Sequence, residues 1–379
     1  MTVDKDLLYL KDALSNKTLK KLSKIPKKCY KYALVAVFLN IINRKHVTRG
    51  QATNLKIVDG IRNYPKLYSQ SNLDNISDTV VETLKATGFY NADKEETIDT
   101  TFQLFRDMVD TISKESAFLI RVGALSELID IEYLRRFNNS PNLQPHHLID
   151  ISLMNGITPT FPEFFPYSDL VNMWNIYLDK KEEYKQKIAS GNIPITQRTS
   201  KPEVRRIVYE IEALLRMLHI TSVTFVESYL YYIFYNLKES KYQTEDKKVE
   251  KLLGFRKVED EEILKNIIRR EFIRDNQGEF NDLVKKYHDF NQKRNRFIHV
   301  SAFPDEKDAS ELMHLYTTGY HYIIEGVKDC IDLVNTIDTR LPTKLKVLHW
   351  WKSVKHPDFD KEEKGNMVGS GNVILGRKF

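Results

Sequence analysis

One stretch of the sequence combines side chains that can act together on a phosphodiester. Arg294, Asn295 and His299 lie within the hexapeptide RNRFIH. A histidine with an ordinary pKa of about 6.5 can accept and return a proton at physiological pH. A guanidinium donates hydrogen bonds in a planar fork that fits a phosphate and can stabilise the added charge of a phosphorane. These groups suit attack by a ribose 2′-hydroxyl on the adjacent phosphate, a reaction that needs no metal ion or other cofactor and that DNA cannot undergo.

The helix expected to carry these residues places Arg294 on its apolar face. That face contains Leu283, Tyr287, Phe290 and Ile298, and Arg294 fills the step between the last two. A buried guanidinium is costly unless it is paired. Arg294 therefore requires an anion, either a carboxylate or the phosphate of a ligand.

His299 and Arg294 point in different directions on a straight helix. They are five residues apart, which corresponds to about 140° around the axis, whereas Asn295 lies four residues before His299 and shares its face. Asn295 can therefore orient the imidazole. Arg294 and His299 can reach one phosphate if the helix ends near Ile298, or if two copies of the motif meet across a dimer axis.

The hexapeptide resembles the motif of the HEPN superfamily, whose ribonucleases carry Arg-Asn/His/Asp-x-x-x-His near the end of a bundle helix. The resemblance covers residues of about 200–337 and includes the aromatic-rich segment SVTFVESYLYYIF with its acidic residue. It implies a metal-independent RNA endonuclease that acts as a homodimer, often in phage defence or in toxin–antitoxin pairs. Other members of the superfamily have lost catalysis and only bind.

The resemblance also implies a role for each residue of the motif. His299 would be the general acid and base, Arg294 the ligand of the phosphate and of the transition state, and Asn295 the group that orients the imidazole. Arg296 and Lys293 would contact the RNA backbone. No residue is expected to bind a metal ion.

Glu227 is the expected supporting residue for this site. Its helical neighbours Val223, Leu230 and Phe234 are apolar, so its carboxylate needs a cationic partner. A purely structural interpretation remains open, in which Arg294 pairs with Glu227 or Glu210 and His299 is a helix-end imidazole favoured by the dipole.

Helical periodicity dominates the chain, which predicts a mainly α fold with an N-terminal helical domain followed by a HEPN-like four-helix bundle. The N-terminal domain, 1–190, is a regulatory or sensor region of no recognised family. Its helices are expected at 5–24, 28–43, 52–62, 77–87, 97–137 and 174–190, with a loop-rich stretch at 146–173. The Gly- and Pro-containing segment 191–202 is the predicted linker. The bundle, 203–340, is expected to contain helices from about 202 to 237, 259 to 274, 280 to 299 and 309 to 337, before a tail, 341–379, with a C-terminal helix and an irregular end.

A second interpretation of the function rests on residues 44–100. Several short helices followed by a possible hairpin in GFYNADKEETID would fit a winged helix-turn-helix. The protein would then be a non-catalytic regulator that binds nucleic acid and uses the HEPN-like bundle for dimerisation. His146, His147 and Asp150 suggest a metal site only weakly, because adjacent histidines point in different directions.

Composition is compatible with these interpretations. The 379 residues carry a formal net charge of +6, which suits contact with RNA without requiring it. The two cysteines, Cys29 and Cys330, have no metal-ligand spacing, and no secretory signal or membrane span is expected. We therefore expect a cytoplasmic protein, restrained by an antitoxin or switched on by an activating partner or ligand, because an unregulated ribonuclease is toxic.

Overall fold

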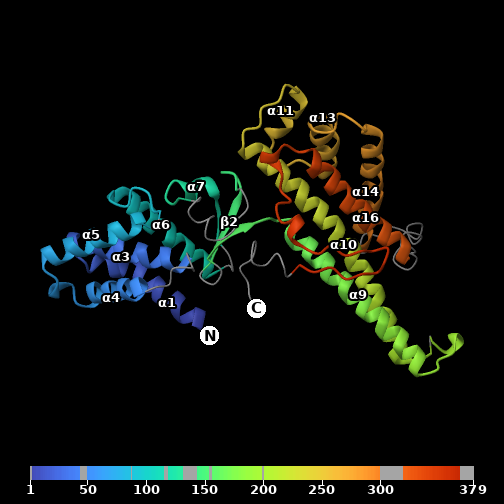
Figure 1. The fold of residues 1–379 in the computed structure, drawn as a ribbon, viewed down its shortest axis with the longest axis horizontal. Coiled ribbons are helices and arrows are strands. Elements are labelled where there is room, and N and C mark those ends of the chain that lie inside the picture. The colour runs from blue at the N-terminus through green and yellow to red at the C-terminus, as the bar shows by residue number, and fades with distance from the viewer. Residues whose placement is uncertain are drawn as a thin grey trace, which may run out of the picture. The chain divides into compact units, whose positions relative to one another are not determined.

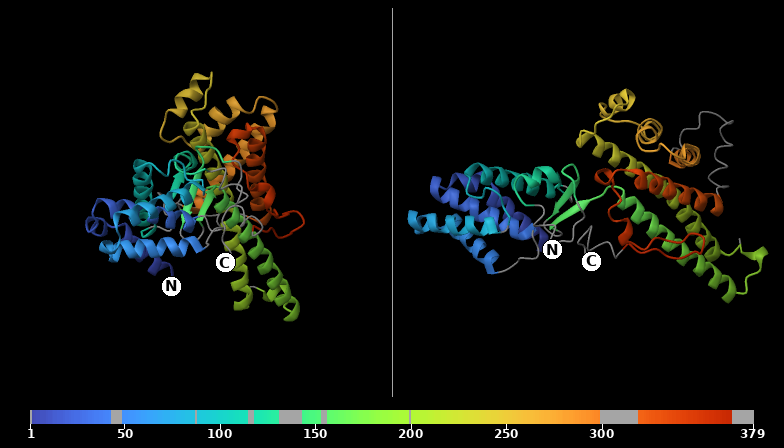
Figure 2. Two further views of the ribbon diagram at one scale, coloured as in Figure 1. Left: turned by 60° about the vertical axis from the view of Figure 1, so that its left-hand side comes forward. Right: turned by 45° about the horizontal axis from the view of Figure 1, so that its top comes forward.

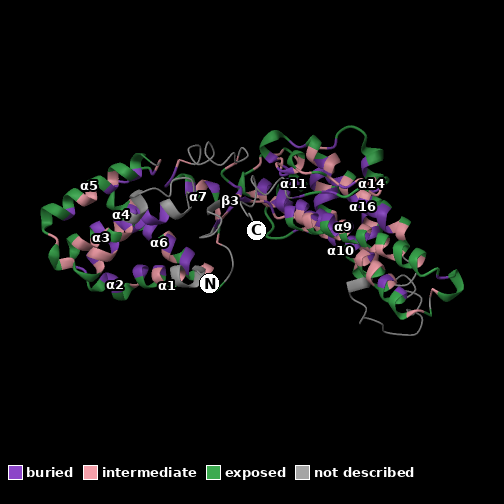
Figure 3. Ribbon diagram, turned by 60° about the horizontal axis from the view of Figure 1, so that its bottom comes forward, coloured by how far each residue is buried: buried purple, intermediate pink, exposed green. Residues whose placement is uncertain are grey.

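A computed structural model describes residues 2–42, 49–86, 88–114, 118–130, 143–152, 156–198, 200–298 and 319–367. The protein is mainly helical, as predicted, and divides into two compact units between Thr160 and Phe161 (Figure 1). In each unit the buried residues lie along the helix faces that meet inside it (Figure 3). None of the helices in the described ranges has the length and apolar character needed to span a bilayer.

The N-terminal unit is built around one buried helix, α3. Its segment YALVAVFL is apolar on every side, and Ala33, Leu34 and Val35 are fully buried. Helices α4, α5 and α6 pack against it, which accounts for the lack of a polar face. The helices of this unit are α1 (Thr2–Leu14), α2 (Asn16–Lys20), α3 (Lys24–Ile42), α4 (Arg49–Asn63), α5 (Gln70–Ala86), α6 (Glu95–Ile112) and α7 (Val122–Ser126), with a 3-10 turn η2 (Pro65–Leu67).

The N-terminal unit also contains a small antiparallel sheet, which two of the sequence predictions did not include. The strands are β1 (Leu119–Arg121), β2 (Leu148–Ser152) and β3 (Gly156–Thr160), in the order β1-β2-β3. Of the helix expected over 97–137, the structure has α6 up to Ile112 and the short α7, with β1 between them, and residues 131–137 lie outside the described residues. Part of the expected loop at 146–173 is strand. Ile149 and Ile151 are buried on either side of Asp150, an alternation too short for the sequence pattern to separate strand from helix.

The hairpin expected after α5 is also wrong. Phe89 forms an isolated bridge with Ile129, forty residues later in the chain, and Glu95 already begins α6. The segment between them consists of turns with Asn91 at a positive φ of 48°. The hairpin that the winged-helix interpretation of 44–100 requires is therefore not formed by residues 88–99.

The C-terminal unit begins with a helical hairpin. Helices α9 (Phe164–Ser190) and α10 (Pro202–Glu239) run side by side in Figures 1 and 2 and pack along their length. The segment 191–202, predicted to link two domains, is instead the connection of this hairpin and contains a 3-10 turn, η3 (Ile195–Gln197). A Gly- and Pro-rich sequence ends helices in both situations, so only packing shows that α9 belongs with α10.

The long helices expected around the candidate site are present. Helix α10 confirms the prediction for 202–237, and α14 (Gln277–Ile298) and α16 (Tyr320–Arg340) pack against it and against each other. The predicted helix at 259–274 is formed by α12 (Asp260–Glu262), a π-helical segment η4 (Ile263–Ile268) and α13 (Arg269–Glu271), preceded by α11 (Lys247–Leu253). The start predicted for the last helix, 309, lies outside the described residues.

The described part of the C-terminal tail, 341–367, packs without the helix expected there. It forms the 3-10 turns η6 (Thr343–Leu345) and η7 (Trp351–Ser353), followed by a folded-back segment in which Lys355 pairs with Asn366. Trp350 is fully buried and its Nε1 donates to Glu163 Oε1 at 3.1 Å. Aromatic packing, not helix formation, therefore fixes residues 341–367.

Candidate functional site

Helix α14 places Arg294 on the buried side of the bundle, as its spacing predicted. Phe280, Val284, Tyr287 and Phe290 form the buried stripe, with exposed fractions between 1% and 6%. Arg294 continues the stripe one turn after Phe290, and its side chain is only 13% exposed. Leu283, assigned to this face from the sequence, is half-buried beside it.

Arg294 is paired with Glu227 of α10. The guanidinium Nη2 donates to Glu227 Oε1, and Arg294 Nε is buried with no hydrogen-bond partner in the described part of the chain. The Glu227 side chain is 27% exposed. Burial raises the pKa of Glu227, and the charge of Arg294 opposes this effect. The cationic partner expected for Glu227 is therefore Arg294, and Glu210 instead pairs with Lys180.

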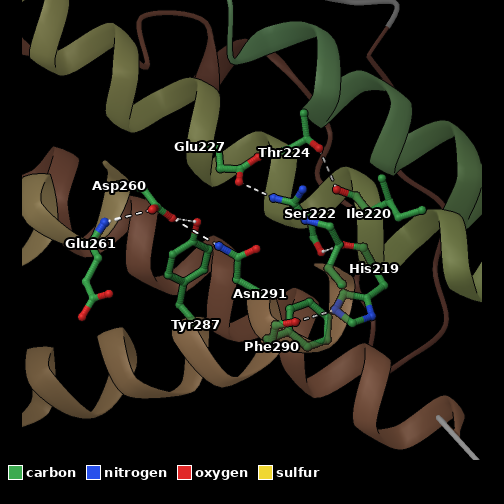
Figure 4. A network of polar contacts seen from close by, with 11 residues as sticks. His219, Ile220, Ser222, Thr224, Glu227, Asp260, Glu261, Tyr287, Phe290 and Asn291 are labelled. Carbon is green, nitrogen blue, oxygen red and sulfur yellow. Dashed lines mark hydrogen bonds and ion pairs between the residues drawn. The ribbon is translucent and has the colours of Figure 1, made fainter. Parts of the chain in front are cut away.

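A second acidic residue, Asp260, also forms hydrogen bonds with α14. Asp260, at the start of α12, accepts hydrogen bonds from Tyr287 Oη at 2.7 Å and from Asn291 Nδ2 at 3.3 Å (Figure 4). Tyr287, Asn291 and Arg294 occupy successive turns of α14. The carboxylates of Asp260 and Glu227 therefore tie this stretch of α14 to two neighbouring helices.

A buried histidine lies beside the arginine. His219 of α10 is fully buried, and its Nε2 is 2.8 Å from the carbonyl oxygen of Phe290. Its ring stacks on the Phe290 ring with the centroids 3.7 Å apart. Burial lowers the pKa of His219 to about 4, and the charges of Arg294 and Lys293 contribute in the same direction. His219 is therefore neutral at physiological pH.

The opposite side of Phe290 is held by α16. Gly326 is buried against this ring, and a Cβ added at Gly326 would overlap the Phe290 side chain. Only glycine permits this close approach of α16 to α14. The packing therefore positions Phe290 under His219, one turn from Arg294.

The remaining predicted residues of the site have different surroundings. Asn295 is exposed on α14. Lys293 is half-buried, with its Nζ 3.9 Å from the centre of the Tyr322 ring, so its charge lies over an aromatic face. The backbone of Arg296 belongs to α14 but its side chain is outside the described set, and His299 lies outside the described residues.

Sequence reasoning missed His219, Asp260 and Asn291 as parts of this network. A signal for His219 was available, because it falls on the buried stripe of α10 with Leu215, Ser222 and Val226, as Arg294 does on α14. Asp260 could not be found in this way, since it belongs to a different helix and meets α14 only through packing.

The weakly suggested metal site has ordinary structural partners. Asp150 Oδ1 accepts from the backbone N–H of Phe118 at 3.3 Å, and His146 and His147 are buried with their rings edge to face. Across the described ranges, no three His, Cys, Asp or Glu side chains gather in a way that could hold a metal ion.

Comparison with known proteins finds no matching family model, no similar curated protein and no similar solved structure. In the described part of the site, the Arg294 guanidinium lies largely buried near the end of α14. Such a group can bind and neutralise an anion.

Proposed function

We propose that the C-terminal unit is a metal-independent RNA endonuclease of HEPN type. The observation that carries this proposal is the position of Arg294, a largely buried arginine on an otherwise apolar stripe, five residues before His299. An arginine in the core is a poor choice for stability alone, because a well-packed apolar side chain would serve at least as well. A requirement for anion binding explains why it is there.

The proposed reaction divides the work between two side chains. His299 accepts the proton of the ribose 2′-hydroxyl as that oxygen attacks the phosphorus. The protonated imidazole then gives a proton to the departing 5′-oxygen. Arg294 stabilises the additional negative charge of the phosphorane. The products are a 2′,3′-cyclic phosphate and a 5′-hydroxyl. Asn295 orients His299, and the ion pair with Glu227 holds the Arg294 guanidinium in place.

The bundle of α10, α12 to α13, α14 and α16 is the HEPN-like unit in this proposal. As the resemblance implies, two chains bring two motifs together in this proposal and complete the phosphate site. The active form is thus a homodimer. An antitoxin restrains it, or an activating partner or ligand switches it on, and the resemblance suggests a toxin or an effector of phage defence.

The test is cleavage of a single-stranded RNA in EDTA, compared with the 2′-deoxy oligonucleotide of the same sequence. We expect cleavage of the RNA alone, with cyclic phosphate ends, and loss of cleavage in Arg294→Ala and His299→Ala. Mixing these two inactive variants should restore part of the activity if each dimer site takes Arg294 from one chain and His299 from the other. Cleavage that persists in both variants excludes the assignment.

One observation favours a second function. Arg294 is already paired with Glu227, which satisfies its charge without any ligand. In a non-catalytic HEPN-like dimerisation unit, this pair would be purely structural. The chain would then form a dimer and bind RNA or another partner equally well with His299→Ala, and no RNA product would form at any protein concentration.

A further inference from the structure

The N-terminal unit contains a groove whose charged lining is entirely cationic. It has a volume of about 630 Å³ and lies where the end of α2 and the start of α3 meet η2 and the start of α5. Its principal lining residues are Lys21, Lys24, Pro26, Pro65, Lys66 and Tyr68. No carboxylate lines it. A ligand in this groove would therefore meet positive charge and apolar surface only.

The two chain segments that form the groove are basic in sequence as well. Residues 15–28, SNKTLKKLSKIPKK, contain six lysines and no acid, and residues 62–73, RNYPKLYSQSNL, contain Arg62 and Lys66 and no acid. In the described part of the chain, Lys21, Lys24 and Lys66 form no ion pair. Unpaired like charges that converge on one concave surface repel each other, and a bound polyanion relieves that repulsion.

Tyr68 adds an aromatic ring to the lining of this basic groove, and Tyr64 precedes the lining residue Pro65 in the chain. Tyr68 lies against α4, where its hydroxyl packs on Gly60 so closely that a Cβ at Gly60 would overlap it. Tyr64, in the residue before the lining Pro65, is 62% exposed. Proteins that bind single-stranded nucleic acids combine a cationic groove along the backbone with aromatic rings on which bases stack. The groove has both components.

We propose that this groove binds single-stranded RNA and thereby recruits the substrate of the C-terminal unit. The choice of RNA rests on the proposed function, whereas the groove itself rests on its lysines and tyrosines. The lysines contact phosphates, and Tyr64 and Tyr68 stack against unpaired bases. A double helix keeps its bases stacked internally, so exposed rings favour a single strand over a duplex.

The experiment measures binding of a fluorescein-labelled oligouridylate by the full chain carrying His299→Ala, over a series of KCl concentrations. We expect the combined variant Lys21→Glu, Lys24→Glu and Lys66→Glu to weaken binding at least about 10-fold and to reduce the slope of log K against log [KCl] by about 2, because each phosphate contact contributes about 0.7. The matched control, Lys56→Glu, Lys94→Glu and Lys114→Glu, makes the same change in net charge at exposed lysines of the same unit and should leave the slope almost unchanged.

Stacking is tested separately at Tyr64. Tyr64→Ala should weaken binding about 5-fold or more, whereas Tyr64→Phe, which keeps the ring, should bind as the parent does. Equal binding by the groove and control variants overturns the proposal. So does tighter binding of a duplex, of polyglutamate or of anionic lipid vesicles that depends on the same three lysines.

The proposed activity and this inference fail in different ways. If the unmodified chain does not cleave RNA but binds oligouridylate through the groove lysines, only the nuclease assignment is contradicted. If the unmodified chain cleaves RNA and the groove variant binds oligouridylate like the control variant, only the groove assignment is contradicted.

Discussion

The ion pair between Arg294 and Glu227 should couple α14 to α10 far more strongly than an ordinary surface pair. The perturbation is a double-mutant cycle with Arg294→Met, Glu227→Gln and the combined variant. Methionine keeps the length and apolar stem of arginine, and glutamine keeps the shape of glutamate without its charge. The cycle therefore isolates the charge–charge interaction.

The burial of the two side chains sets the expected magnitude. Arg294 is 13% exposed and Glu227 is 27% exposed, so the pair lies between a surface pair and a fully buried one. Exposed pairs contribute about 0.2–1 kcal/mol, and removing one partner of a buried pair costs about 3–5 kcal/mol. A coupling free energy of about 2 kcal/mol follows, in the range of hydrogen bonds to charged groups.

The pH dependence provides a second signature. Burial raises the folded-state pKa of Glu227, and Arg294 opposes that rise. An acid with a raised folded-state pKa contributes stability that is present at low pH and is lost as the pH rises through that pKa. In Arg294→Met the opposing charge is gone, so this variant should recover part of its lost stability between neutral pH and about pH 5.

The assay is urea unfolding followed by far-ultraviolet circular dichroism at both pH values. Lys286 and Asp329, which join α14 to α16 at 2.9 Å with the lysine 58% exposed, supply the matched control cycle. That pair should show a coupling below about 1 kcal/mol. A coupling for Arg294 and Glu227 no larger than that of the control would show that partial burial does not strengthen this ion pair.

Three further predictions concern buried residues of the C-terminal unit. Burial raises the pKa of Glu163 to about 8, so the wild type loses stability as the pH rises from about 4.5 through 8. The melting temperature of Glu163→Gln should fall much less over that pH range. Gly326→Ala should cost about 1–3 kcal/mol in urea unfolding because its methyl group meets the Phe290 ring, whereas Gly278→Ala, which has open space, should be neutral or stabilising by up to about 1 kcal/mol. The pKa of His219 is lowered to about 4, so the wild type loses stability as the pH falls from about 6.5, and a loss of the same size in His219→Gln would contradict the assignment.

The parts of the fold with long apolar periodicity were predictable from sequence. Helices α3, α10 and α14 have stripes or runs of apolar residues that settle both their type and their approximate ends. The same reasoning placed Arg294 on the buried face of α14 and gave Glu227 a cationic partner. Both predictions depend only on which face of a helix a residue occupies.

The missed features depend on contacts between distant segments. The short strands around Ile149 and the bridge between Phe89 and Ile129 carry too few residues to show a period. The domain boundary was misplaced because a helical hairpin and a linker use the same Gly- and Pro-rich signals. Asp260 joined the site only because α12 packs beside α14, which no local pattern records.

The most direct test of the nuclease proposal is the rate of RNA cleavage in EDTA by His299→Ala beside that of His288→Ala. Both variants remove an imidazole from the same region of the chain, and His288 is an ordinary, partly exposed histidine of α14. We expect a loss of at least about 100-fold for His299→Ala, the usual contribution of a positioned acid–base group, and a rate near that of the wild type for His288→Ala. Equal rates for the two variants, or no cleavage by the wild type, would contradict the nuclease proposal.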